Sequence, residues 1–187
     1  GAVVAAVRLP GRAGVRFAQA EYAYAGGISG MTTAELTPND PQYGQQYHHT
    51  LMKNDLAWNI TLGSPTVPIA IIDNGVELTH PDLAPNLWVN ADEIAGNGID
   101  DDGNGYVDDV NGYDFLDGDA SPMPGTVGLS LDHGTHVAGI AAAATNNGVG
   151  VAGTAGGARI MALRFSTGST IVSSLLAQAI VYAVDNG

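Results

Sequence analysis

Two residues of this sequence, Asp73 and His133, stand where a proton could be transferred. Asp73 follows the apolar segment 68–72, which is too short for a helix and typical of a buried parallel strand. A carboxylate there is costly unless it accepts hydrogen bonds or faces a cation. His133 begins the Ala-rich run HGTHVAGIAAAA, where the positive end of a helix dipole keeps the imidazole available as a neutral base. Because Gly134 and Gly139 carry no side chain, this helix can approach a sheet closely. Residue types alone do not decide whether the Asp and the His meet.

A second set of residues could bind a cation. The run from residue 100 to residue 108 fits the first nine positions of an EF-hand-type calcium loop, which has oxygen ligands at alternate positions and Gly at the sharp turn. The expected ligands are Asp100, Asp102, Asn104, Tyr106 and Asp108. Asn111 replaces the bidentate Glu that ends such loops, so we expect either a weaker site or a further oxygen from Asp109. The alternative is a solvated acidic loop, in which carboxylates this close would repel one another.

The elements that must position these residues alternate along the chain. Apolar runs predict strands at 68–72 and 160–165, and helical spacing predicts helices at 133–144 and 170–184. This order predicts an α/β fold with three layers, in which a parallel β-sheet lies between helices and the crossovers are right-handed. The carboxyl ends of such strands are where α/β proteins place their chemistry. Residues 84–132 form a polar connection too long for an ordinary loop, so we expect it to be functional.

Composition excludes several classes of function. The 187 residues carry a net charge of -13, which repels phosphate backbones and anionic lipid, so we expect neither nucleic acid nor a membrane as a partner. The chain has no cysteine and therefore no disulfide or thiolate metal site. No apolar run reaches the roughly 18 residues of a membrane span. Residues 1–36 are expected to form a separate small element with a linker, and residues 37–187 a single domain.

The sequence around Asp73 and His133 resembles the Asp and His signatures of the subtilisin-like serine proteases (peptidase S8). The matching runs are IAIIDNGVELTHPDL and HGTHVAGIA, with NDPQYGQQ upstream and TNNGVGVAGTA downstream. The resemblance is closest to the thermitase-like branch and covers residues 37–187. It implies that Asp73 orients His133, that His133 is the general base, and that the nucleophilic serine lies beyond Gly187. We therefore expect a secreted, monomeric endopeptidase acting on proteins or peptides, whose fold is incomplete here at the C-terminal side and whose 187 residues alone are inactive.

The resemblance also implies partners within the chain. Residues 12–25 are similar to the end of the family's inhibitory propeptide, which occupies the substrate cleft before self-cleavage. A second calcium site is implied, with ligands from Asp40, Asp82 and Asn147 and from the carbonyls of Ala144, Val149 and Val151. One departure from the family is Asn74, which stands where Ser or Thr is usual and could loosen the hydrogen bonding of Asp73.

Two other functions stay open. The chain could be a non-catalytic calcium-binding or adhesion module that uses the same fold, in which case the serine would be missing from the whole protein. It could also be a metal-dependent hydrolase that uses His133 and His136, although the Glu of the zinc-protease helix motif is absent.

Overall fold

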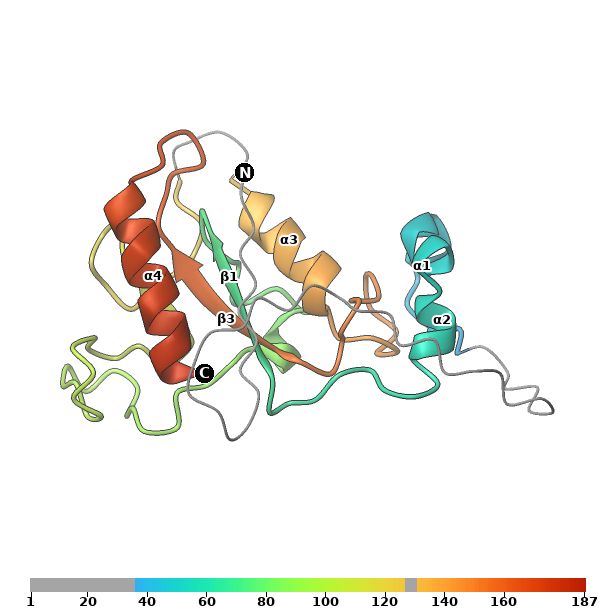
Figure 1. Ribbon diagram of the computed structural model, residues 1–187, viewed down its shortest axis with the longest axis horizontal. Helices are drawn as coiled ribbons and strands as arrows, with labels where there is room; N and C mark the ends of the chain where they lie inside the picture. Colours follow the sequence, from blue (N-terminus) through green and yellow to red (C-terminus); the bar gives the residue numbers. More distant parts are fainter. Residues whose placement is uncertain (1–35, 127–130) are drawn as a thin grey trace.

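The computed structural model describes residues 36–126 and 131–187 (Figure 1). The expected propeptide remnant at 12–25, and all but the last residue of the expected first element, lie outside the described residues. The elements of the described residues follow in the order η1 (Tyr43–Gln45), α1 (Tyr47–Met52), α2 (Asn54–Ala57), β1 (Pro68–Asp73), η2 (Ala84–Asn86), β2 (Gly112–Asp114), α3 (His133–Ala142), β3 (Arg159–Arg164) and α4 (Ser173–Asn186). Within the described ranges, no helix is both long enough and apolar enough to span a bilayer.

A parallel sheet of three strands forms the centre of the described part of the chain, in the order β1-β3-β2. Its register pairs Asp73 at the end of β1 with Arg164 at the end of β3, and Arg164 with Asp114 at the end of β2. The carboxyl ends of the three strands therefore meet at one edge, which is where an α/β sheet places its chemistry.

Helices cover the two faces of this sheet, with α3 on one side and α4 on the other (Figure 1). Successive side chains of a strand point to opposite faces. Ile72 accordingly packs in the cluster that contains Tyr182 of α4, while Ile71 packs in the cluster that contains Ala138 of α3. Burial on both sides explains why the strands are continuous apolar runs. The prediction of a three-layer α/β fold with a parallel sheet is confirmed.

The connection at 84–132 contains regular structure that the sequence analysis did not predict, namely η2 and β2. β2 has only three residues, too few for a recognisable alternation. It also begins with Gly112, where a Cβ would lie 1.9 Å from the carbonyl oxygen of Ala162, so this strand approaches β3 too closely for a side chain. The last helix begins at Ser173, later than predicted, because Ile171 forms a β-bridge with Ser166.

The short helices α1 and α2 bring a histidine into a buried contact with the loop after α3. His49 is fully buried, and its Nε2 lies 3.0 Å from the carbonyl oxygen of Ala152. Its Nδ1 lies 2.8 Å from the side-chain nitrogen of Asn54 and accepts a hydrogen bond from it. The ring also packs against Trp58, with the ring centroids 4.8 Å apart. This histidine is therefore held in its neutral form, with the proton on Nε2.

Candidate functional site

The end of β1 and the start of α3 bring Asp73 and His133 into direct contact. His133 Nδ1 lies 2.8 Å from Oδ1 and 2.9 Å from Oδ2 of Asp73. When Nδ1 donates its proton to the carboxylate, the neutral ring carries its lone pair on Nε2. The Asp73 side chain is 11% exposed and that of His133 is 43% exposed, so the carboxylate is shielded while the imidazole remains accessible. The pair has the geometry of an oriented general base.

Glycine at position 134 allows the helix and the strand to lie this close. A Cβ on Gly134 would be 2.2 Å from the carbonyl oxygen of Gly75 and 3.0 Å from the Cβ of Asp73. A side chain at position 134 could therefore be accommodated only if the helix moved away from the strand. The packing thus requires glycine at position 134, where the sequence analysis expected it to allow a close approach.

Asn74 keeps Asp73 hydrogen-bonded. Its backbone N–H donates to Oδ1 of Asp73 over 2.7 Å. Its own side-chain oxygen accepts a hydrogen bond from the backbone N–H of Gly134 over 2.9 Å. Asn74 therefore hydrogen-bonds Asp73 through its backbone and the residue that follows His133 through its side chain.

His136 lies on the same helix but is exposed and does not join the pair. In residues 36–126 and 131–187, the one set of three metal-ligating side chains whose ligand atoms lie within 4.8 Å of one another is Glu93, Asp100 and Asp102. The hypothesis of a metal-dependent hydrolase built on His133 and His136 therefore has no support in the described residues.

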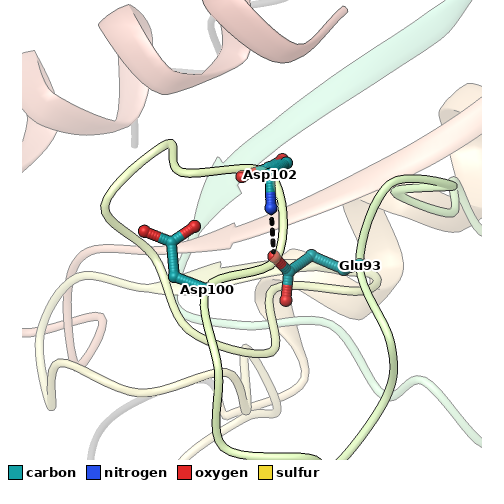
Figure 2. A group of neighbouring side chains, drawn as sticks. All are labelled: Glu93, Asp100 and Asp102. Carbon is teal, nitrogen blue, oxygen red and sulfur yellow. Dashed lines mark hydrogen bonds between the residues drawn. The ribbon is translucent and has the colours of Figure 1, made fainter.

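Figure 2 shows Glu93, Asp100 and Asp102 around a common space in the acidic loop. Both oxygens of Asp100 accept backbone hydrogen bonds, from Asn104 over 3.0 Å and from Gly105 over 2.8 Å. Gly105 has a φ of 94°, which is the left-handed turn that the sixth position of the loop requires. The described loop thus has the positive-φ turn that a calcium loop needs at its sixth position, next to three carboxylates whose oxygens lie within 4.8 Å of one another.

Glu93 was not identified from the sequence. Its Oε1 accepts backbone hydrogen bonds from Asp101 over 2.7 Å and from Asp102 over 3.3 Å, and its Oε2 accepts one from Asp108 over 3.0 Å. It is 8% exposed. A loop of this type normally ends with an acidic residue at its twelfth position, and here the third carboxylate comes from a residue that precedes the loop. The signal that could have found it is a lone Glu shortly before the aspartate run.

Asp102 carries the charge that a cation needs. Partial loss of solvent raises the pKa of this exposed carboxylate, but hydrogen bonds with Asn90, Asn104 and Asp100 outweigh that effect and hold the pKa below its usual value. The Asn90 side chain lies 2.9 Å from Asp102 Oδ2. Asp102 is therefore ionised at neutral pH.

The other predicted ligands of this loop have different surroundings. The two oxygens of Asp108 accept backbone hydrogen bonds from Asn97 over 3.0 Å and from Gly98 over 3.1 Å. Asp109 is fully buried and accepts a hydrogen bond from the hydroxyl of Tyr182 over 2.5 Å. Burial and the neighbouring Asp109 raise the pKa of Tyr182, so the tyrosine stays a donor. Asp109 thus connects the acidic loop to α4, and neither it nor Asp108 belongs to the set of three carboxylates.

The last two predicted ligands of this loop are Asn104 and Tyr106. The Asn104 side chain lies 3.0 Å from Asp102 Oδ2, and the Tyr106 N–H donates to the side-chain oxygen of Asn104.

The residues of the second expected calcium site come together from three separate segments. Asp40 accepts hydrogen bonds from the backbone N–H groups of Asn146 over 2.7 Å and of Asn147 over 3.4 Å. Asp82 accepts from the Asn147 side chain over 2.9 Å and from the Val151 N–H over 2.8 Å. Both carboxylates are buried. The N-terminal segment is thereby attached to the loop after α3, which carries the remaining predicted ligands, Ala144 and Val149.

The chain is similar to known proteins over most of its length. Residues 64–187 match the family model described as the subtilase family. The chain is 41% identical over 160 residues to the thermophilic serine proteinase of Bacillus sp. (strain AK1), covering 84% of this chain and 33% of that protein. It is 40% identical over 154 residues to thermitase of Thermoactinomyces vulgaris, covering 81% of this chain and 45% of thermitase. It is also 40% identical over 161 residues to the extracellular protease of Xanthomonas campestris pv. campestris, covering 80% of this chain and 26% of that protein.

A solved structure also resembles the chain. A protease from Pseudoalteromonas arctica superposes with a TM-score of 0.59 at 29% identity, covering 79% of this chain and 44% of the other. The chain spans 26% to 45% of the length of the three relatives above.

Proposed function

The chain belongs to the subtilase family, and on this premise we propose that it is the N-terminal part of the catalytic domain of a serine endopeptidase. In this proposal Asp73 is the orienting carboxylate, His133 is the general base, and the nucleophilic serine lies outside residues 1–187. The serines that follow His133 are Ser166, Ser169, Ser173 and Ser174. They lack the sequence context of the family's nucleophile, so we propose that residues 1–187 alone hydrolyse no peptide bond.

The hydrogen bond between His133 Nδ1 and the carboxylate of Asp73 is the observation that supports this function. In the proposed reaction, His133 Nε2 takes the proton of the serine hydroxyl as its oxygen attacks the peptide carbonyl carbon. Asp73 stabilises the imidazolium that forms and holds the ring in the productive orientation. The same nitrogen then gives its proton to the leaving amine, and water repeats the sequence on the acyl-enzyme.

We also propose that calcium is a structural ligand of the folded protein. One ion would be held by the carboxylates of Glu93, Asp100 and Asp102. Further oxygens would come from Asn104 and from the carbonyl of Tyr106. The carboxylates of Asp108 and Asp109 would lie around these ligands. Asp40, Asp82 and Asn147 would hold a second, with the carbonyls of Ala144, Val149 and Val151. A bound cation would neutralise carboxylates that otherwise repel one another. What supports the first site is the set of three carboxylates within 4.8 Å around a turn of calcium-loop geometry.

The names of relatives support a proposal on where the enzyme acts. We propose that the whole protein acts outside the cell on proteins or peptides, and that residues 12–25 belong to an inhibitory propeptide. The support for the location is that relatives such as the one from Xanthomonas campestris are named extracellular proteases. Calcium in place of disulfides is consistent with a cysteine-free exported hydrolase.

The proposal is tested on the full-length protein with a fluorophosphonate probe, which reacts with activated serines. We expect one labelled serine, found by peptide mapping outside residues 1–187, and hydrolysis of an unfolded protein substrate that the probe abolishes. A full-length protein that is folded but neither labelled nor hydrolytic would overturn the proposal and favour the non-catalytic calcium-binding module.

A further inference from the structure

The helix that carries His133 is capped by a side chain from outside the helix. The first N–H groups of a helix have no partner within the helix, and a side chain at the N-cap position usually accepts one of them. Asp132 stands at the N-cap of α3 but makes no side-chain cap hydrogen bond. The N–H of Gly134 instead donates to the side-chain oxygen of Asn74 over 2.9 Å.

Asn74 is well placed to hold the helix firmly. It is 2% exposed, so its hydrogen bond to Gly134 does not compete with bulk water. A hydrogen bond whose loss would leave a buried donor unsatisfied is costly to break. The bond also runs to the residue immediately after His133, so any shift of Asn74 is transmitted to the imidazole through a single peptide unit.

Two adjacent contacts therefore join the last residue of β1 and the residue after it to α3. Asp73 bonds the His133 ring, and Asn74 bonds the Gly134 backbone, both across a separation of 60 residues. A single polar contact would hold the start of the helix at one point, whereas two neighbouring contacts also restrict its rotation against the strand end. A third contact supports this arrangement, in which the Glu77 N–H donates to the Thr135 hydroxyl over 2.9 Å.

We infer that Asn74 is a positioning residue, whose side-chain oxygen holds α3 so that His133 stays aligned with Asp73. The effect of Asn74 on catalysis rests on the proposed peptidase function, whereas its effect on the Asp73–His133 hydrogen bond is independent of that function. A displacement of about 1 Å between reacting groups lowers the rate of a catalysed step by about 100-fold. Loss of the Asn74 oxygen should therefore reduce kcat and leave KM nearly unchanged, since Asn74 acts through His133.

The test compares three variants of the full-length protein. Asn74→Leu removes the acceptor at similar volume, and Asn74→Asp keeps an acceptor oxygen at the helix N-terminus. Asn86→Leu is the matched control, because Asn86 is a buried asparagine whose side chain donates to the carbonyl of Ala142 at the opposite end of the same helix. The kcat and KM of the wild type and of each variant are measured at alkaline pH, where the rate no longer changes with pH. The Nδ1 proton of His133 is observed by NMR after 15N-histidine labelling.

We expect Asn74→Leu to lower kcat by 10- to 100-fold with KM changed less than about twofold. The Nδ1 proton signal should broaden or exchange faster in that variant. Asn74→Asp should recover most of kcat, and Asn86→Leu should lower the melting temperature without changing kcat or the proton signal. Asn74→Leu that folds with wild-type kcat and an unchanged signal would overturn the inference. So would an equal loss of kcat in Asn86→Leu, because the effect would then report helix stability alone. If Asn74→Leu does not fold, Asn74→Asp alone decides the test. A folded Asn74→Asp protein whose kcat is not close to the wild-type value would then contradict the inference.

Failure of the proposed function gives a different pattern. A wild-type protein with no hydrolysis and no probe labelling would contradict the peptidase proposal, while the Nδ1 proton signal would still decide whether Asn74 positions His133.

Discussion

His133 Nδ1 lies within 2.9 Å of both carboxylate oxygens of Asp73, although 60 residues separate the two in the sequence. One residue is the last of β1 and the other is the first of α3. A single strand–helix pair thus supplies both the proposed base and the carboxylate proposed to orient it.

Replacing the carboxylate tests the role of this contact. Asp73→Asn presents an amide N–H₂ or an oxygen to Nδ1 and no longer favours the ring form with its lone pair on Nε2. We expect kcat for peptide hydrolysis by the full-length protein to fall by about 10⁴-fold, which is the factor established for the triad carboxylate of serine proteases. The exposed Asp185→Asn is the control and should leave kcat unchanged. A loss below about tenfold would show that Asp73 does not orient the base.

Gly134→Ala tests the close approach of α3 to β1. The added Cβ would lie 2.2 Å from the carbonyl oxygen of Gly75, so the helix must move. We expect a loss of about 1 to 3 kcal/mol in the free energy of unfolding, measured by urea denaturation, together with a lower kcat. Gly139→Ala on the same helix has no atom within 4 Å of its Cβ and should stabilise the protein by about 0.5 to 1 kcal/mol. Equal effects of the two variants would contradict the packing argument.

Calcium removal tests the acidic loop. A site saturated 100-fold above its Kd stabilises the folded state by about 2.7 kcal/mol, so an excess of chelator should lower the melting temperature by several degrees. Glu93→Gln removes one of the three clustered carboxylate charges, and we expect the calcium concentration needed for half of the thermal shift to rise at least about tenfold.

The neighbouring Asp92→Asn is the control for this measurement. Asp92 is exposed and lies outside the set formed by Glu93, Asp100 and Asp102, so its variant should keep the wild-type calcium response. A melting temperature that does not respond to chelator in the wild-type protein would refute a structural role for calcium.

His49 predicts a dependence of stability on pH. Burial lowers its pKa, and the neighbouring His48 lowers it further, while the hydrogen bond to the Ala152 carbonyl raises it by less than burial lowers it. Below a pH of about 6.5, the unfolded chain binds a proton at His49 that the folded state resists. The stabilising contribution is therefore complete above this pH and is lost as the pH falls towards the folded-state pKa.

The measurement is urea unfolding between about pH 5 and pH 8 at saturating calcium, with the histidine replaced. We expect His49→Gln to reduce the slope of stability against pH below about pH 6.5, because glutamine does not titrate. The exposed His136→Gln should leave the slope as it is in the wild type. An identical slope in His49→Gln and the wild type would show that His49 is not the group responsible.

Local patterns in the sequence predicted several elements correctly for a physical reason. The apolar run that ends at Asp73 is a strand because both of its faces are buried, and the turn residues after it stop the strand. The helix begins at His133 as predicted. The run from residue 100 to residue 108 also predicts a calcium loop, because its expected ligands come from alternate residues of one short segment, and calcium binding there stays a prediction.

Non-local features escaped the sequence analysis. β2 exists because Gly112 lets the chain approach Ala162, a contact that has no local periodicity. Glu93 joins the acidic loop only because the chain folds back on itself. His49 is buried only because the loop at Ala152 covers it.

The sequence by itself determined which chemical groups are available and at which ends of which elements they stand, since strand and helix periodicity and turn residues are properties of neighbours along the chain. The tertiary structure alone decided the distances between those groups. Asp73 meets His133 because Gly134 fits beneath the carbonyl of Gly75 and Asn74 caps the helix, and such contacts depend on packing across 60 residues that no local pattern records.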